Sequence, residues 1–309
     1  MSLDMDLTVS PIGTVIGDMD LSGDKGISQE GNSFAPLIDR TDLRGICYAN
    51  RPAEEPPAGH GCGLRRDHTK GRMQAAELSK DCPAQTVRVT GRQVPQCLDI
   101  GLPGDISRGA FWMALAAPQV GSRMILRHID LNPARLSFVD TLLRMGVAIR
   151  EEVIFCDGKD WFGNLDIRGR SLRPIQIAPK DIPLLVDEIP LLAVLAGKAK
   201  GVSSIRGASA LRTKKNDGIA AIVTNLKKMD VRVEEFSDGL AICGTGHLRG
   251  AELDSFGDHR IAMAFAIAGL LAEENMTVIR NAECLVMSYP DFQPGLLKLM
   301  DRSSCVLGA

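Results

Sequence analysis

The chain has 309 residues, of which 45% are hydrophobic, 24% charged and 4% aromatic, and its formal net charge at pH 7 is −2. A chain of this length is expected to form about two domains, and the hydrophobic fraction is large enough to fill their cores. A nearly balanced charge with few aromatic rings excludes a general nucleic-acid-binding surface, which needs a basic face and stacking rings.

The sequence also argues against export, membrane insertion and a bound metal. Its first residues, MSLDMDLTVSPIG, lack the basic and apolar regions of a secretory signal. No apolar run reaches the roughly 18 residues of a membrane span. The eight cysteines include no C-x-x-C pair, and the group Cys47, His60, Cys62 and His68 fits no standard zinc pattern. We therefore predict a cytoplasmic protein with reduced thiols, no metal and no cofactor.

In chain order, the first predicted element is a hairpin. Residues 7–24 (LTVSPIGTVIGDMDLSGD) offer two short apolar strands around Gly13 and Gly17, with no helix of their own. A hairpin this short is not stable alone, so we expect it to pair with strands elsewhere in the chain.

An irregular segment follows the hairpin. Residues 31–63 are rich in proline and glycine and show no sustained hydrophobic period, which is typical of a loop or linker. A loop this long within a compact domain is unusual, and is either functional or disordered. A helix over 67–78 and strands over 85–91 and 96–101 come next and make only a fragment of a domain.

From residue 104 onward, the predicted elements repeat three times in the order helix, strand, helix and hairpin. The copies span 104–169, 187–244 and 257–300, and the third lacks its closing hairpin. The first strand of each copy carries an aliphatic residue followed by an arginine at nearly even spacing: Arg127, Arg206 and Arg280. An internal repeat of this kind determines the architecture.

The two ends of the chain are predicted to close one domain. The N-terminal hairpin supplies the strands that the third copy lacks. Residues 1–23 and 103–309 would then form a complete three-repeat α/β domain, and residues 24–102 the remnant of a second domain.

Unusual polar residues gather where the predicted helices start: Asp187 and Glu188, Lys214 and Lys215 in the first turn of a helix over 211–229, and Asp258, His259 and Arg260. Capping explains an acidic residue such as Asp258. It does not explain the cations, which are unfavourable at the positive end of a helix unless an anion is present. Helices whose N-termini converge build an anion site from backbone N–H groups. We therefore predict phosphate and carboxylate ligands.

Lys25 is a further candidate, because it is flanked by glycines in SGDKGIS (22–28). A turn with a solvated lysine is the plain alternative. The other glycine-rich stretches do not predict a nucleotide-binding or nucleophilic site. GTGHLRG (244–250) lacks the spacing of a dinucleotide-binding loop, and the sequence contains no Walker loop and no nucleophile elbow.

The ordered series of motifs resembles the 5-enolpyruvylshikimate-3-phosphate (EPSP) synthase family of enolpyruvyl transferases. It covers nearly all of the chain outside residues 31–63. The motifs that carry the resemblance are SGDKGIS (22–28), LRRDHTKGRM (64–73), PGDISRGAF (103–111), NPAR (132–135), DEIPLLAVLA (187–196), GASALRTKKNDGI (207–219), GDHRIAM (257–263) and SYPDF (288–292).

The resemblance implies an inside-out α/β barrel domain of three βαβαββ repeats, and a second, here truncated, domain of the same type. It implies transfer of the enolpyruvyl group of phosphoenolpyruvate to the 5-hydroxyl of shikimate 3-phosphate, a step of aromatic amino-acid biosynthesis. The expected partners are these two small anionic substrates, without nucleic acid or membrane. The expected state is a monomer or a weakly self-associating chain.

The resemblance also assigns roles to individual residues. Lys25 would bind phosphoenolpyruvate and assist proton transfer, and Asp187 would be the base toward the substrate hydroxyl. His259 and Arg260 would hold the anionic groups of phosphoenolpyruvate. The other substrate-binding residues would be Lys214 and Arg66, on the shikimate phosphate side, with Ser28 and Arg212.

Three positions depart from the family pattern. Glu30 replaces a substrate-binding arginine, Lys215 replaces the catalytic glutamate, and Gly218 replaces an arginine that binds phosphoenolpyruvate. The family motifs G-N-A-G-T-x-x-R, R-P-M and S-A-Q of the second domain have no counterpart. Reduced sensitivity to glyphosate is expected, because its contacts lie partly in these segments.

These departures leave three hypotheses. The first is an active, shortened EPSP synthase-type transferase. The second is a catalytically impaired relative that only binds an anionic ligand or a partner. The third is a truncated chain that folds poorly. Phosphate release from both substrates distinguishes the first from the others.

Overall fold

The computed structural model describes residues 5–21, 103–157, 160–212 and 216–305. The elements predicted between residues 24 and 102 lie outside the described residues. The division of the chain into 1–23 with 103–309 and a remnant over 24–102 therefore stays a prediction.

The described residues form three small β-sheets. In spatial order, the first contains β2 (Ile16–Asp20), β3 (Arg123–Asp130), β5 (Asp160–Arg168) and β4 (Ala148–Asp157). The second contains β6 (Gln176–Ile177), β7 (Gly201–Ile205), β9 (Gly239–Gly244) and β8 (Arg232–Phe236). The third contains β1 (Leu7–Val9), β11 (Thr277–Arg280) and β10 (Glu252–Asp254).

All three sheets are built around a central strand with the same two kinds of neighbour. The central strands β3, β7 and β11 each have a parallel neighbour, which is β2, β6 or β10. Each also has an antiparallel neighbour, which is β5, β9 or β1. The repeat predicted from the sequence and its α/β class are therefore confirmed.

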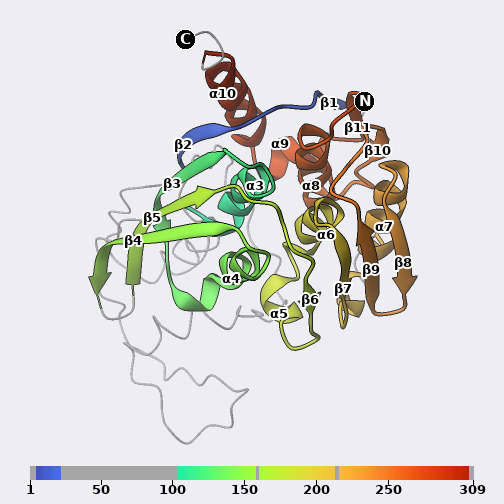
Figure 1. Ribbon diagram of the computed structural model, residues 1–309, viewed down its shortest axis with the longest axis horizontal. Coiled ribbons are helices and arrows are strands. Elements are labelled where there is room, and N and C mark those ends of the chain that lie inside the picture. The colour runs from blue at the N-terminus through green and yellow to red at the C-terminus, as the bar shows by residue number, and fades with distance from the viewer. Residues whose placement is uncertain (1–4, 22–102, 158–159, 213–215, 306–309) are drawn as a thin grey trace, which may run out of the picture.

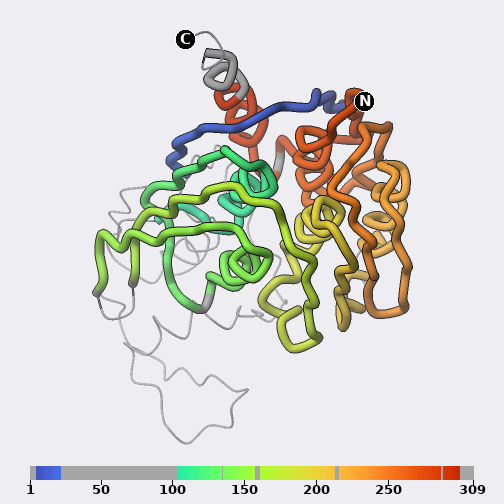
Figure 2. Tube along the Cα trace, viewed as in Figure 1, coloured from blue at the N-terminus to red at the C-terminus, as the bar shows by residue number. Residues whose placement is uncertain are grey.

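The predicted N-terminal hairpin is wrong, because its two strands lie in different sheets. Thr8 of β1 pairs with Val278 in the third sheet, whereas Met19 of β2 pairs with Leu126 in the first. Figure 2 shows the blue N-terminal segment running from the orange third unit to the green first unit. Both central strands would otherwise present an edge with unpaired backbone groups, so one segment completes two sheets.

The helices that lead into the central strands are buried. Nearly every residue is buried in α3 (Ile106–Ala116), α6 (Ile189–Lys198) and α8 (His259–Leu270), as expected for helices that are apolar on all sides. These helices contact one another, and Figure 1 places them at the centre, between the first sheet and the other two. The sheets thus surround the helices.

The remaining helices follow the central strands or connect units. They are α4 (Ser137–Arg144), α5 (Ile182–Leu185), α7 (Gly218–Lys228), α9 (Cys284–Ser288) and α10 (Phe292–Cys305), with 3₁₀ turns at Pro133–Arg135 and Ser209–Leu211. In the described part of the chain, none of the helices has the length and apolar character needed to cross a bilayer.

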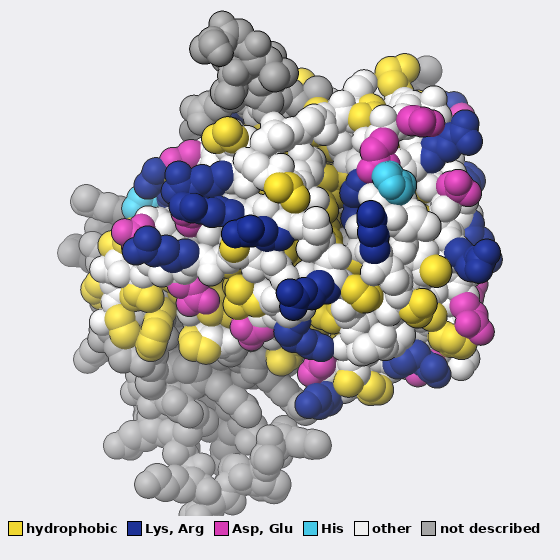
Figure 3. All heavy atoms as spheres, viewed as in Figure 1, with side chains coloured by type: hydrophobic (Ala, Val, Ile, Leu, Met, Phe, Trp, Pro, Cys, Tyr) yellow, Lys and Arg dark blue, Asp and Glu magenta, His cyan; other side chains and the backbone are white. Residues whose placement is uncertain are grey.

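The outer surface over the sheets carries charges of both signs. Figure 3 shows lysine and arginine side chains interspersed with acidic ones on the face in view. Two arginines of β3 are paired: Arg123 binds Asp166 at 2.8 Å, and Arg127 binds Asp18. This face therefore does not present a continuous basic surface.

Candidate functional site

The three central helices begin with acidic residues. Asp105 precedes α3, and its carboxylate accepts a hydrogen bond from the Ser107 N–H at 3.0 Å. Asp258 precedes α8, and its carboxylate accepts from the Arg260 N–H at 2.7 Å. Glu188 precedes α6 and makes no such side-chain cap. Its carboxyl group is therefore available to other partners.

Two residues predicted from the sequence are brought together where α6 and α8 begin. The carboxylate of Asp187 forms an ion pair with the guanidinium of Arg260, and their side chains are 18% and 28% exposed. His259, the first residue of α8, adjoins Arg260. The pair combines a carboxylate base with a cation at a helix N-terminus, the arrangement expected at a site for anionic substrates.

Glu188 belongs to the same cluster, although the sequence marked it only as polar and gave it no role. Burial raises the pKa of its carboxyl to about 7, and the neighbouring charge of Asp187 adds to this rise. A hydrogen bond with the Ser107 side chain and the charge of Arg260 act in the opposite direction. A hydrogen bond with a residue of α3 and the charge of a residue of α8 thus both act on this one carboxyl group.

A second charged network, which the sequence analysis did not assign, surrounds the start of α3. The guanidinium of Arg135 lies 3.3 Å from the carboxylate of Asp130 and 3.7 Å from that of Asp105. Arg108 also approaches Asp105, at 3.7 Å. The sequence motifs PGDISRGAF and NPAR contain Asp105, Arg108 and Arg135, so they could have pointed to this network. Asp105 also accepts a hydrogen bond from the Ser107 N–H, and the Ser107 side chain hydrogen-bonds to Glu188. The first turn of α3 therefore connects this network to Glu188.

The structure places Arg212 beside the β8–β9 hairpin. Its guanidinium binds the carboxylates of Asp217 and Glu235 at 2.6 and 2.8 Å. It also donates to the backbone carbonyls of Phe236 and Ser237, at 2.6 and 2.9 Å. These four contacts hold the start of α7 against the hairpin, whereas the substrate contact expected of Arg212 stays a prediction.

The helix predicted over 211–229 begins later than expected. Asp217 caps α7 by accepting from the Ala220 N–H at 3.0 Å, so the helix starts at Gly218. The expectation that Lys214 and Lys215 occupy its first turn is therefore wrong, because both precede the cap. The sequence pattern is continuous here, but the aspartate bonds to a backbone N–H and sets the boundary.

The loop before α7 also contacts the turn before α8. The side-chain amide of Asn216 donates to the carbonyl of Phe256. The Lys214 and Lys215 side chains lie outside the described residues, as do four other residues singled out from the sequence: Lys25, Ser28, Glu30 and Arg66. Of the predicted site, the structure therefore describes Asp187, Arg212, His259 and Arg260.

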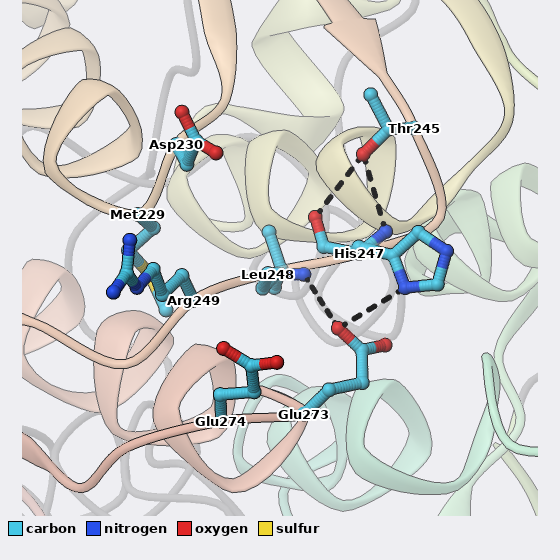
Figure 4. Close-up of a pocket in the computed structure, with 8 residues that line it drawn as sticks. All are labelled: Met229, Asp230, Thr245, His247, Leu248, Arg249, Glu273 and Glu274. Atoms are coloured by element: carbon cyan, nitrogen blue, oxygen red, sulfur yellow. Dashed lines mark hydrogen bonds and ion pairs between the residues drawn. The ribbon is translucent and has the colours of Figure 1, made fainter.

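A surface pocket of about 270 Å³ lies beyond the C-terminal ends of α7 and α8 (Figure 4). It is lined by Met229, Asp230, Thr245, His247, Leu248, Arg249, Glu273 and Glu274. Glu273 accepts hydrogen bonds there from the Leu248 N–H, at 3.0 Å, and lies 3.4 Å from the His247 ring. The lining carries charges of both signs, with Asp230, Glu273 and Glu274 beside His247 and Arg249. Within the described ranges, no cluster of three or more histidine, cysteine or acidic residues is arranged to hold a metal.

Comparison with known proteins agrees with the family resemblance found in the sequence. The sequence model described as EPSP synthase (3-phosphoshikimate 1-carboxyvinyltransferase) matches residues 48–296. The 3-phosphoshikimate 1-carboxyvinyltransferases of Synechococcus sp. (strain JA-3-3Ab) and Aquifex aeolicus are each 38% identical to this chain. These two alignments cover 97% and 88% of this chain, and 72% and 68% of the relatives.

Solved structures agree with the sequence comparison. An EPSP synthase from Acinetobacter baumannii matches with a TM-score of 0.68 and 30% identity, over 77% of this chain and 54% of that chain. The enolpyruvyl transferase NikO from Streptomyces tendae matches with a TM-score of 0.53 at 23% identity, which supports the fold alone. The chain thus spans about half the length of the solved Acinetobacter structure.

Proposed function

The chain belongs to the EPSP synthase family of transferases, and we propose that it transfers the enolpyruvyl group of phosphoenolpyruvate to the 5-hydroxyl of shikimate 3-phosphate. The observation that carries this proposal is the ion pair between Asp187 and Arg260 where α6 and α8 begin. Both residues occupy positions that the family motifs assign to the reaction.

The reaction consists of an addition followed by an elimination. In the addition, the substrate hydroxyl bonds to the second carbon of phosphoenolpyruvate while the methylene carbon gains a proton. In the elimination, the methyl group formed loses a proton and phosphate leaves. The chain must therefore supply a base near the hydroxyl, an acid near the methylene, and cations for the phosphate and carboxylate groups.

Asp187 is suited to accept the proton of the hydroxyl, because it is a mostly buried carboxylate whose position is fixed by Arg260. Arg260 itself is suited to hold an anionic group of phosphoenolpyruvate. A guanidinium offers five N–H donors, so it can bind the substrate while it remains paired with Asp187. Lys25 would act in the proton transfer at the methylene.

The first experiment measures phosphate release from shikimate 3-phosphate and phosphoenolpyruvate together. We expect the purified chain to release phosphate above a blank, and Asp187→Asn to lower kcat by about 10² to 10⁴, as is typical for loss of a general base. Glu234→Gln, which changes an exposed carboxylate on β8, is the control and should leave kcat unchanged. Absence of phosphate release from the unmodified chain would refute the proposal.

A second candidate function is anion binding without turnover. Gly218 favours it, because the first residue of α7 carries no side chain where the family has an arginine. Arg212 cannot easily compensate, since its guanidinium already has four partners. Calorimetry that detects phosphoenolpyruvate binding, in a sample that releases no phosphate, would support this second function.

The remaining features inferred from the sequence stay predictions. They are the reduced glyphosate sensitivity, the cytoplasmic location, and the monomeric or weakly self-associating state.

A further inference from the structure

The chain enters α8 through a turn in which two successive residues have a left-handed backbone. Phe256 has a φ of 52° and Gly257 a φ of 70°, and the Asp258 N–H donates to the Ser255 carbonyl at 3.0 Å. Positive φ values at both central residues are the pattern of a type I′ turn. Glycine and asparagine adopt this conformation readily, whereas a bulky aromatic residue rarely does. The backbone of Phe256 is therefore strained.

Hydrogen bonds within the turn stabilise this backbone. Phe256 lies outside the hydrophobic core, and its side chain is 37% exposed. Its N–H donates to the Asp254 carboxylate at 2.7 Å, and the Gly257 N–H donates to the Ser255 hydroxyl at 2.9 Å. Polar contacts therefore hold the turn where apolar packing is incomplete.

Two other parts of the chain hold the first residues of the turn. The Asn281 amide donates to the Asp254 carboxylate at 3.2 Å, and the Ser255 hydroxyl donates to the Asn281 carbonyl at 2.6 Å. The Asn225 side chain, from α7, donates to the Asp254 carbonyl at 2.8 Å and accepts from the Asp254 N–H at 3.2 Å. These contacts fix Asp254 and Ser255, the residues that lead into the strained part.

Asn216 contacts the strained part itself. Its side-chain amide donates to the carbonyl of Phe256, and a Cβ atom added at Gly257 would lie 3.8 Å from the same amide nitrogen. Asn216 is exposed and directly precedes Asp217, the residue that caps α7. It therefore connects the start of α7 to the turn that leads into α8.

The position of this turn matters for the candidate site because α8 begins directly after it. Asp258 caps α8 by accepting from the Arg260 N–H at 2.7 Å, and the Arg260 guanidinium is paired with Asp187. A displaced turn would carry the cap and Arg260 with it. The first residue of α7 is Gly218, where the family has an arginine, so the site depends all the more on where Arg260 lies.

We propose that Asn216 is a positioning residue, which holds the left-handed turn at Phe256 and thereby fixes Arg260 where an anionic substrate binds. The inference rests on the proposed function for the identity of the anion, which is phosphoenolpyruvate. The role of Asn216 needs no contact with the substrate. When its hydrogen bond is lost, Phe256 relaxes from the left-handed conformation, the start of α8 becomes less ordered, and the anion binds more weakly.

The test is isothermal titration calorimetry of phosphoenolpyruvate into the full chain. We expect Asn216→Ala to weaken the Kd by about threefold to tenfold, the effect of one hydrogen bond. Asn216→Gln keeps an amide donor and should recover most of the affinity. Gln176→Ala is the control and should leave the Kd unchanged, because it removes an exposed amide that donates to a carbonyl of the second sheet, that of Val202 at 3.2 Å.

Phe256→Asn is the informative second variant. Asparagine followed by glycine is a preferred type I′ pair, so the turn should keep its shape without help from Asn216. In this background, Asn216→Ala should weaken the Kd by less than about twofold, which makes the two substitutions non-additive. A merely structural role for Asn216 would lower stability in both backgrounds without producing this difference in Kd.

Hydrogen exchange followed by mass spectrometry gives a readout that needs no ligand. In Asn216→Ala, the amides of residues 255–260 should exchange faster, because the turn opens more often. Those of β7 and β9 should keep the rate of the unmodified chain.

Several outcomes would overturn the inference. They are an unchanged Kd in Asn216→Ala, an equal loss of affinity in both backgrounds, unchanged exchange over residues 255–260, and failure of both phosphoenolpyruvate and inorganic phosphate to bind the unmodified chain. These outcomes differ from failure of the proposed function. Binding that depends on Asn216 without phosphate release supports its role while refuting turnover, and turnover with a Kd unaffected by Asn216→Ala does the reverse.

Discussion

Arg212 links the start of α7 to the β8–β9 hairpin through its guanidinium group. Its guanidinium connects Asp217, which caps α7, to Glu235 and two carbonyls of the hairpin. In Arg212→Met these groups lose their donor. We expect the free energy of unfolding to fall by about 1.5–3 kcal/mol, the usual range for hydrogen bonds that involve charged groups. Urea denaturation followed by circular dichroism measures the change.

The matched comparison is Arg123→Met. Arg123 also binds a carboxylate through two hydrogen bonds, with Asp166, but its side chain is 47% exposed, compared with 24% for Arg212. An exposed pair contributes little, because water and salt screen it. If the two variants lose the same free energy, the contacts of Arg212 are not specially stabilising, and its predicted contact with substrate gains weight.

At the scale of residues, the sequence predicted part of the site. Asp187 and Arg260 were found because helix starts have a local pattern of cations and acids that capping does not explain. The hydrogen bond between Glu188 and Ser107 was not, since these residues are far apart in the sequence and meet only when α6 packs against α3. For Arg212 the sequence identifies a guanidinium, but it cannot say whether that group faces a ligand or the hairpin beside it.

At the scale of elements, the central helices and the β4–β5 and β8–β9 hairpins were predictable, and the short strands β6 and β10 were not. β6 has two residues and β10 has three, too few for any hydrophobic period to appear. Their existence depends on the parallel edges of β7 and β11, which are formed by other parts of the chain. The late start of α7 has a different cause. The apolar pattern begins before Asp217 and continues past it, but this capping residue sets the first residue of the helix at Gly218.

The close contact between α8 and the third sheet gives a prediction for an element. A Cβ atom added at Gly269 would lie 2.6 Å from the Cβ of Thr277 and 2.6 Å from a methyl of Val9. Gly269→Ala should therefore lower the free energy of unfolding by about 1–3 kcal/mol through overpacking. Alanine is otherwise the better helix former by about 1 kcal/mol, so a measured loss reports the contact and not helix propensity.

Gly218→Ala provides the control in another helix. A Cβ at this position has its nearest neighbour, the Leu211 carbonyl oxygen, at 3.4 Å, so the substitution should change the urea midpoint little. Should Gly269→Ala prove as stable as Gly218→Ala, the helix and the sheet would have to be farther apart than the structure indicates.

At the scale of the molecule, the threefold repeat could be predicted from the sequence, and the path of the N-terminal segment could not. The repeat follows from patterns within each copy. The path depends on which sheet edges remain open after the copies have formed, and that is a property of all three together. The sequence correctly indicated that the third unit needs a strand from elsewhere, but it did not show that the next strand goes to the first unit.

Deletion of residues 1–9 tests this connection. It removes β1 and its pairing with β11, together with the hydrogen bond from the Ala282 N–H to the Met5 carbonyl at 2.7 Å. We expect amides of β10 and β11 to exchange hydrogen faster, because β11 becomes an open edge. Hydrogen exchange followed by mass spectrometry measures this. β7 and β9 of the second sheet serve as an internal reference, and equal acceleration in both sheets would contradict a specific role for β1.

The position of β1 also sets an order of events during synthesis. Strand β2 can pair as soon as β3 has left the ribosome, and the first sheet can be complete once β5 follows. Strand β1 must wait, since its partner β11 is made only after the strands of the first two sheets. A contact between such distant parts of a chain carries a high cost in loop entropy and forms slowly. Closure of the third unit therefore comes after the first two sheets can form, and until then β1 is unpaired and β11 presents an open edge.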